Sequence, residues 1–151
     1  MAVRLQEEPF DLGDEVARLT LGRTDAGAVV TFSGICRDRA DSGERLVALT
    51  LEHYPGMTEE ELRRIEAEAR GRWALADSLV LHRHGRILPG EPIVLVVTLA
   101  AHRKAAFEAA EFLMDYLKTS APFWKREETA GGGSWVAAKG SDDAAAERWK
   151  A

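Results

Sequence analysis

Two lysines near the end of a helix-type segment, Lys118 and Lys125, carry the clearest chemical signal in this sequence. Pro122 lies between them and cannot continue a helix, so the chain must turn there. The aromatic pair Phe123 and Trp124 would then hold Lys125 against an apolar surface. Neighbouring cations lower the pKa of a lysine and so provide a neutral amine as a base or nucleophile. A lysine in the last turn of a helix also complements the helix dipole, which leaves Lys118 a purely structural explanation.

Further cationic side chains, those of His102, Arg103 and Arg37, follow strand-type segments. His102 and Arg103 stand where a strand passes into a helix, and the unpaired N–H groups of a helix N-terminus attract anions. The planar guanidinium group of arginine suits phosphate in particular. The plainer alternatives are a solvated helix start with a capping histidine and an ordinary surface arginine, and the sequence leaves them open.

The separation of the two clusters along one helix limits how they could work together. His102 and Lys118 are sixteen residues apart, which is about 24 Å along a straight helix at 1.5 Å per residue. One small ligand cannot touch both ends of such a helix. If both clusters serve one site, they come from two copies of the chain in a symmetric dimer with shared pockets, and otherwise they form separate sites.

The histidines and the single cysteine give weaker signals. His82 and His84 point to one face of a strand and resemble half of a metal site, but no third ligand accompanies them, so we interpret them as surface or hydrogen-bonding residues. Cys36 excludes an intramolecular disulfide and is more typical of a small buried residue than of a reactive thiolate. We find neither a Ser-His-Asp spacing nor a glycine-rich phosphate loop.

The elements that must position these residues follow from the apolar pattern. Thr58 and Glu61 form a capping box that predicts a helix up to Gly71, and Phe107, Ala110, Met114 and Leu117 predict one face of a second helix over 102–119. A shorter helix is expected near residues 14–21. The predicted strands are 28–33, 46–54, 79–84, 93–100 and a short one around Trp135 and Val136.

The connecting segments are less regular. Residues 37–45 predict a polar, mobile loop. Residues 123–128 follow the second long helix, and no strand is predicted for them. The C-terminal tail from about residue 140 is expected to be flexible, either as a loose helix or as a disordered segment. Strands mixed with two long helices predict an α+β fold, a two-layer α/β sandwich with a mainly antiparallel sheet.

Composition sets outer limits on the function. The 151 residues, 46% of them hydrophobic, suit a single domain over 1–151. A formal charge of −5 argues against a general nucleic-acid binder. The longest apolar run, residues 93–101, is too short to cross a membrane, and the N-terminal residues lack the apolar stretch of a signal peptide. We therefore expect a cytoplasmic protein that does not bind membranes.

Three strings of the sequence resemble one known family. GAVVTFSGICR, LEHYPGMTEEEL and AHRKAAFEAAEFLMDYLKTSAPFWKRE are similar to the catalytic (large) subunit of molybdopterin synthase, and the similarity runs from about Gly27 to the terminal AAERW. The MDYLKTSAPFWKRE string is long enough to be highly specific. The resemblance implies a hammerhead-like form of the α/β sandwich.

The resemblance also implies an activity and its partners. Members of this family are sulfurtransferases that convert cyclic pyranopterin monophosphate to the dithiolene pterin in molybdenum cofactor biosynthesis. The sulfur comes from the C-terminal Gly-Gly thiocarboxylate of a small ubiquitin-like subunit, and a homodimer forms the core of a heterotetramer. The resemblance implies no cofactor and no metal.

Residue roles carry over where the motifs match. Lys118 and Lys125 resemble the two catalytic lysines, Arg37 the arginine of the substrate loop, and His102 with Arg103 the anion-binding pair of the neighbouring subunit. The implied substrate-binding set is Ile35, Cys36, Arg37, His102, Arg103, Lys118, Lys125, Arg126 and Glu127. Cys36 stands where the family is expected to have an aliphatic residue, and Arg39 stands where it often has histidine.

Two other classes of function compete with sulfur transfer. The chain could be a non-catalytic docking module for a ubiquitin-like protein, with the lysines as electrostatic contacts. It could also be a phosphoester hydrolase that uses His102 and Arg103, although the sequence offers no obvious nucleophile or metal site for that reaction.

Overall fold

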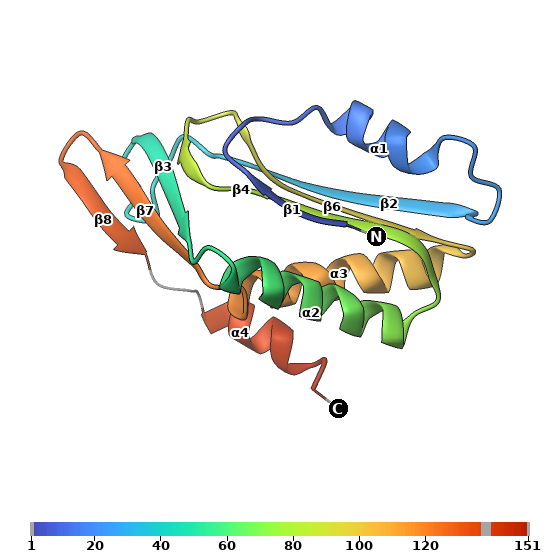
Figure 1. The fold of residues 1–151 in the computed structure, drawn as a ribbon. Coiled ribbons are helices and arrows are strands. Elements are labelled where there is room, and N and C mark those ends of the chain that lie inside the picture. The colour runs from blue at the N-terminus through green and yellow to red at the C-terminus, as the bar shows by residue number, and fades with distance from the viewer. Residues whose placement is uncertain (1, 137–139, 151) are drawn as a thin grey trace.

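A computed structural model describes residues 2–136 and 140–150 of the chain. Within them lie eight strands and four helices, and Figure 1 shows how they are arranged. The strands are β1 (Ala2–Gln6), β2 (Ala28–Ile35), β3 (Leu46–His53), β4 (Leu75–Arg83), β5 (Gly85–Ile87), β6 (Pro92–Ala100), β7 (Phe123–Thr129) and β8 (Gly132–Val136). The helices are α1 (Leu12–Thr20), α2 (Met57–Arg72), α3 (Arg103–Thr119) and α4 (Gly140–Glu147).

The larger of two sheets has the strand order β1-β4-β6-β2. β6 lies between β4 and β2 and is antiparallel to both, while β1 is parallel to β4. Because β6 is covered on both faces, its residues from Val94 to Ala100 are all buried, as its apolar sequence predicts. Helices α2 and α3 cover one face of this sheet and α1 covers the other (Figure 1).

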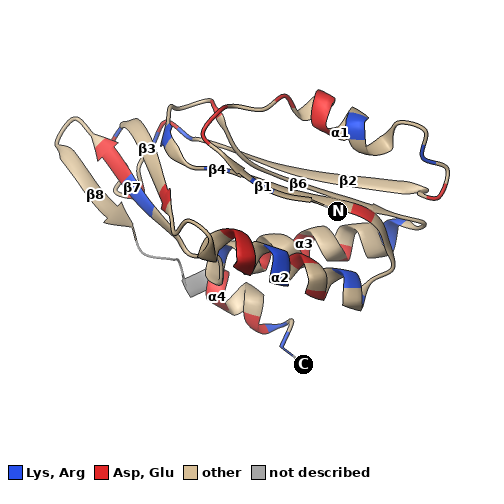
Figure 2. Cartoon of the chain, viewed as in Figure 1, with Lys and Arg blue, Asp and Glu red and all other residues tan. Residues whose placement is uncertain are grey.

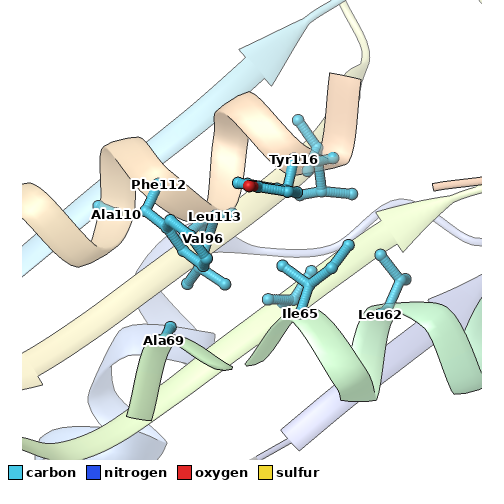
Figure 3. Close-up of a cluster of buried hydrophobic side chains, with 11 residues drawn as sticks. Leu62, Ile65, Ala69, Val96, Ala110, Phe112, Leu113 and Tyr116 are labelled. Carbon is cyan, nitrogen blue, oxygen red and sulfur yellow. The ribbon is translucent and has the colours of Figure 1, made fainter. Parts of the chain in front are cut away.

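The main core lies between this sheet and the two long helices. Figure 3 shows Leu62, Ile65 and Ala69 of α2 beside residues of α3 such as Leu113 and Tyr116. Leu62, Ile65 and Ala69 are at most 1% exposed, so the predicted apolar positions of α2 are confirmed. This packing fixes where α3 ends.

The smaller sheet, with the order β5-β3-β7-β8, is entirely antiparallel. It lies beyond one end of the larger sheet (Figure 1). A separate apolar cluster of Cys36, Leu49, Leu51 and Ile87 packs under it, with Ile93 of the larger sheet against the cluster. The mixed fold with mainly antiparallel pairing is confirmed, but the strands divide into two sheets.

One predicted helix cap is wrong, and one predicted helix face is confirmed only in part. Helix α2 begins at Met57 after Gly56, whose φ of 86° suits glycine, and the Gly56 N–H donates to Glu59 Oε1 at 3.0 Å, so Thr58 is not the cap. In α3, Ala110 and Leu117 of the predicted face are buried, but Phe107 is 60% exposed. The buried face also includes Ala106 and Leu113, so it overlaps the predicted face and extends beyond it on one side.

Three strands, β1, β5 and β7, are not predicted from the sequence. β1 pairs with β4, and β7 is the segment 123–129 that the pattern left unassigned. In the tail, where the sequence allowed a helix or disorder, the structure has α4, and the Trp149 ring packs against Trp73 and Phe112. Met1, residues 137–139 and Ala151, which the single-domain prediction includes, lie outside the described residues. The described helices include none with the length and apolar character needed to span a membrane.

Candidate active site

A cavity of about 360 Å³ lies where the two sheets meet the end of α3. Its walls come from the end of β2 with the loop after it, from β3, β4, β6 and β7, and from the last turn of α3. The implied site residues that line it are Ile35, Cys36, Arg37, Lys118, Lys125 and Glu127. Segments far apart in the sequence therefore supply one concave site.

The two lysines reach this cavity from different elements. Lys118 is exposed in the last turn of α3, beside the buried Leu117. Lys125 lies on β7 opposite Leu51 of β3, and its Nζ is 3.9 Å from Asp41 Oδ2. Because alternate residues of a strand face opposite sides, Lys125 and Glu127 share the face toward the cavity.

Glu127 holds the loop that carries Arg37. Glu127 is 6% exposed, and its carboxylate accepts the Asp41 N–H with both oxygens at 3.2 Å. The Asp41 carboxylate in turn lies 3.9 Å from the Arg37 guanidinium. Basic and acidic side chains thus both line the cavity. Figure 2 shows both kinds of residue along β7. Glu127 acts here on the loop backbone.

Cys36 is a buried thiol and not an activated nucleophile. It is 3% exposed, and its Sγ lies 3.6 Å from the Arg37 carbonyl oxygen. Burial raises the pKa of the Cys36 thiol above its usual value, and the nearby Glu91 carboxylate raises it further. The interpretation of Cys36 as a small buried residue is therefore confirmed, although it also lines the cavity.

One cavity residue, His82, has no counterpart in the site expected from the sequence. Its ring stacks on Phe123 with the centroids 4.0 Å apart and an interplanar angle of 20°. The sequence pattern grouped His82 with His84, but the His84 ring contacts His53 at 4.3 Å. Among residues 2–136 and 140–150, no group of three or more histidine, cysteine or acidic side chains is placed to hold a metal. Only the place of His82, half-buried in the cavity that Lys118 also lines, identifies it, and that place depends on the fold.

Three implied site residues do not line the cavity of this chain. His102 is the N-cap of α3, without a side-chain capping bond, and both it and Arg103 are exposed at the end of the helix far from Lys118. The Arg126 guanidinium lies against Gly133 of β8, on the face of β7 opposite Lys125. The structure therefore brings together the lysines and Arg37 but leaves the His102-Arg103 pair apart.

Three kinds of comparison with known proteins indicate the same family. The MoaE protein family matches residues 5–120. The molybdopterin synthase catalytic subunit of Mesorhizobium japonicum is 60% identical over 150 residues, covering 98% of this chain and 92% of that protein. The solved structure of a molybdopterin biosynthesis MoaE protein from Burkholderia ambifaria has a TM-score of 0.84 at 49% identity and covers 100% of this chain and 99% of its own.

A more distant structure shares the fold. It is titled as a complex of subunits 1 and 2 of molybdopterin-converting factor from Helicobacter pylori, and its matching chain has a TM-score of 0.74 at 20% identity, with 89% of each chain covered. The fold, the family match and the full-length relatives agree with one another. The chain belongs to the MoaE protein family, that of the molybdopterin synthase catalytic subunits.

Proposed function

We propose that this chain is the catalytic subunit of a cytoplasmic molybdopterin synthase and that its cavity is the place of sulfur transfer. The substrate is cyclic pyranopterin monophosphate, which receives two sulfurs in successive steps. The observation that carries the proposal is that Lys118 and Lys125, from α3 and β7, line one cavity. Two amines at one concave site can serve one reaction, whereas two separate surface lysines cannot.

Each transfer divides into two chemical steps. The thiocarboxylate sulfur of the partner attacks a side-chain carbon of the pterin. The C–S bond forms as the bond from that carbon to its oxygen substituent breaks, and the electron pair of the broken bond stays on the leaving oxygen. The partner is then attached to the pterin as a thioester. Water then attacks the thioester carbonyl, the acyl–sulfur bond breaks, and the partner leaves with a carboxylate terminus. A lysine ammonium stabilises the oxyanion that develops on the carbonyl, and a neutral lysine moves the protons.

The proposal needs a partner and a second copy of the chain. Such a cavity would admit an extended peptide terminus whose glycines let its backbone approach closely. The Helicobacter pylori structure, titled as a complex of two subunits, supports such a partner. The substrate phosphate would meet Arg37 of one copy together with His102 and Arg103 of the other, in a homodimer that forms the core of a heterotetramer.

The substitution Lys118→Ala tests the catalytic role. Dithiolene pterin formation, measured with the precursor and a thiocarboxylated partner, is expected to fall at least about 100-fold because an oxyanion contact is lost. The free energy of unfolding should change by less than about 1 kcal/mol, since only a helix-end charge is removed.

Lys150→Ala is the matched control, because Lys150 pairs with Glu147 outside the cavity. It should leave turnover unchanged. Normal turnover in the Lys118 variant would remove that lysine from the mechanism. Tight binding of the partner by the unmodified chain, without any product, would instead favour a docking module.

A further inference from the structure

His82 is a largely enclosed, titratable side chain in the cavity that the reaction described above does not use. It lies near the end of β4, with Phe123 and Lys125 of β7 and Lys118 of α3 around the same cavity. A polar ring that the fold places among the proposed catalytic groups calls for a role in positioning them. The inference below rests on the proposed function for its kinetic consequence but not for its geometry.

The protonation pattern of the ring follows from one hydrogen bond. His82 Nδ1 lies 2.7 Å from the Arg83 carbonyl oxygen. A carbonyl oxygen can only accept, so Nδ1 carries the proton and donates it. If the ring is neutral, Nε2 at its far end then holds a free lone pair and is an acceptor.

The surroundings keep the ring neutral and fix its plane. Burial lowers the pKa of His82 to about 4, and the positive charge of Lys118 lowers it as well, so the ring is uncharged at neutral pH. The stacked Phe123 ring restricts rotation of the imidazole plane. A rigid acceptor thus lines the same cavity as the Lys118 ammonium group.

We propose that His82 is a positioning residue whose Nε2 accepts a hydrogen bond from the Lys118 ammonium group and directs it at the reacting carbonyl. An ammonium group has three N–H donors, so a bond to His82 leaves others for the oxyanion of the thioester step. A hydrogen bond to a charged group is stronger than one between neutral groups, which suits it to fix a flexible lysine side chain.

Three substitutions separate this role from a packing role. The side-chain oxygen of Gln is as far from Cβ, counted in bonds, as Nε2 is in histidine, so Gln can replace the acceptor. Asn keeps only a polar group at the nearer position of Nδ1. Phe keeps the stack on Phe123 but has no acceptor. In His82→Asn and His82→Phe, kcat for dithiolene pterin formation should fall about tenfold or more, while KM for the precursor stays within about threefold. His82→Gln should restore most of kcat. Wild-type kcat in a folded His82→Phe variant would overturn the proposal.

A spectroscopic measurement tests the contact without any turnover. With labelled histidine and lysine, NMR should find His82 neutral with the proton on Nδ1, and the side-chain resonances of Lys118 should shift in His82→Phe while those of Lys150 do not. A proton on Nε2, or an unchanged Lys118 signal, would refute the inference. If the wild-type chain makes no dithiolene pterin, the proposed function fails, and the NMR result still decides the role of His82.

Discussion

A carboxyl group with almost no access to solvent lies in the middle of α2. Glu66 is 4% exposed, accepts a hydrogen bond from Ser78 Oγ at 3.2 Å, and has Arg70 as a partly exposed ion partner at 3.5 Å. Burial raises the pKa of Glu66, and the contacts with Ser78 and Arg70 offset this only in part. The charged form is therefore costly in the folded state.

This cost predicts a stabilising substitution. Glu66→Gln keeps the acceptor for Ser78 and removes the charge, so at pH 8 the free energy of unfolding should rise by about 1 kcal/mol. A raised pKa in the folded state means that the penalty is absent below the ordinary value of 4.5 and grows as pH rises through the folded-state value. Urea unfolding at pH 4.5 and pH 8 should thus show the gain only at the higher pH.

The neighbouring Glu68→Gln on the same helix is the control, since the Glu68 side chain is 38% exposed and pairs with Arg72. It should change stability little at either pH. An equal gain from both substitutions, or a gain at Glu66 that does not depend on pH, would show that burial of the charge is not the cause.

Among single residues, the sequence singles out the two lysines that line the cavity, but not all of the side chains around them. Lys118 and Lys125 stand out because a proline and aromatic residues lie between them. Arg126 looks equivalent to Lys125 in the string, yet it faces the other side of β7. That distinction needs the strand, because only strand alternation turns successive side chains to opposite faces. The sequence does not single out His82, because its place in the cavity depends on stacking against Phe123, which lies far along the chain.

At the scale of elements, one hydroxyl group joins the start of α2 to the turn before β7. Thr58 is fully buried; its Oγ1 accepts the Tyr54 N–H at 2.9 Å and donates to the Pro122 carbonyl oxygen at 3.0 Å. The turn at Pro122 sets where β7 begins and therefore where Lys125 lies. Thr58 thus links two segments that are distant in sequence.

Replacement of Thr58 by valine should weaken this link. The shape is nearly kept, but one backbone N–H and one carbonyl lose their buried partner, so the free energy of unfolding should fall by about 1 to 3 kcal/mol. Chemical denaturation measures the change. Thr58→Ser retains the hydroxyl and should lose distinctly less, and a serine variant as unstable as the valine variant would mean that the methyl contacts matter more than the hydrogen bonds.

The same scale shows why some elements were predictable and others were not. α2, α3 and β6 have long apolar periodicities that local sequence displays directly. β7 has the sequence FWKREET, whose charged residues show no alternation of apolar and polar side chains. It is a strand because β3 pairs with it on one side and β8 on the other. β1 likewise depends on β4, about 75 residues away in the chain. Strand pairing is non-local, so local patterns do not reveal it.

At the scale of the whole molecule, the arrangement of the charged groups is incomplete in one copy. The cavity contains Lys118, Lys125 and Arg37, whereas His102 and Arg103 are exposed at the other end of α3. α3 runs unbroken from Arg103 to Thr119, so one cavity of this chain does not reach both ends of the helix. If His102 and Arg103 bind the substrate phosphate, they do so in the cavity of another copy.

A mixture of two inactive variants tests this shared site. Lys118→Ala and Arg103→Ala each damage both sites of their own homodimer. In a mixed dimer, however, one site takes Lys118 and Arg103 from the two unaltered positions and is intact. After subunit exchange at equal concentrations, half of the dimers are mixed, so about a quarter of the wild-type rate of dithiolene pterin formation should return. Chains that carry complete sites would give only the sum of the two variant rates, and two Lys118→Ala preparations exchanged in the same way provide the baseline.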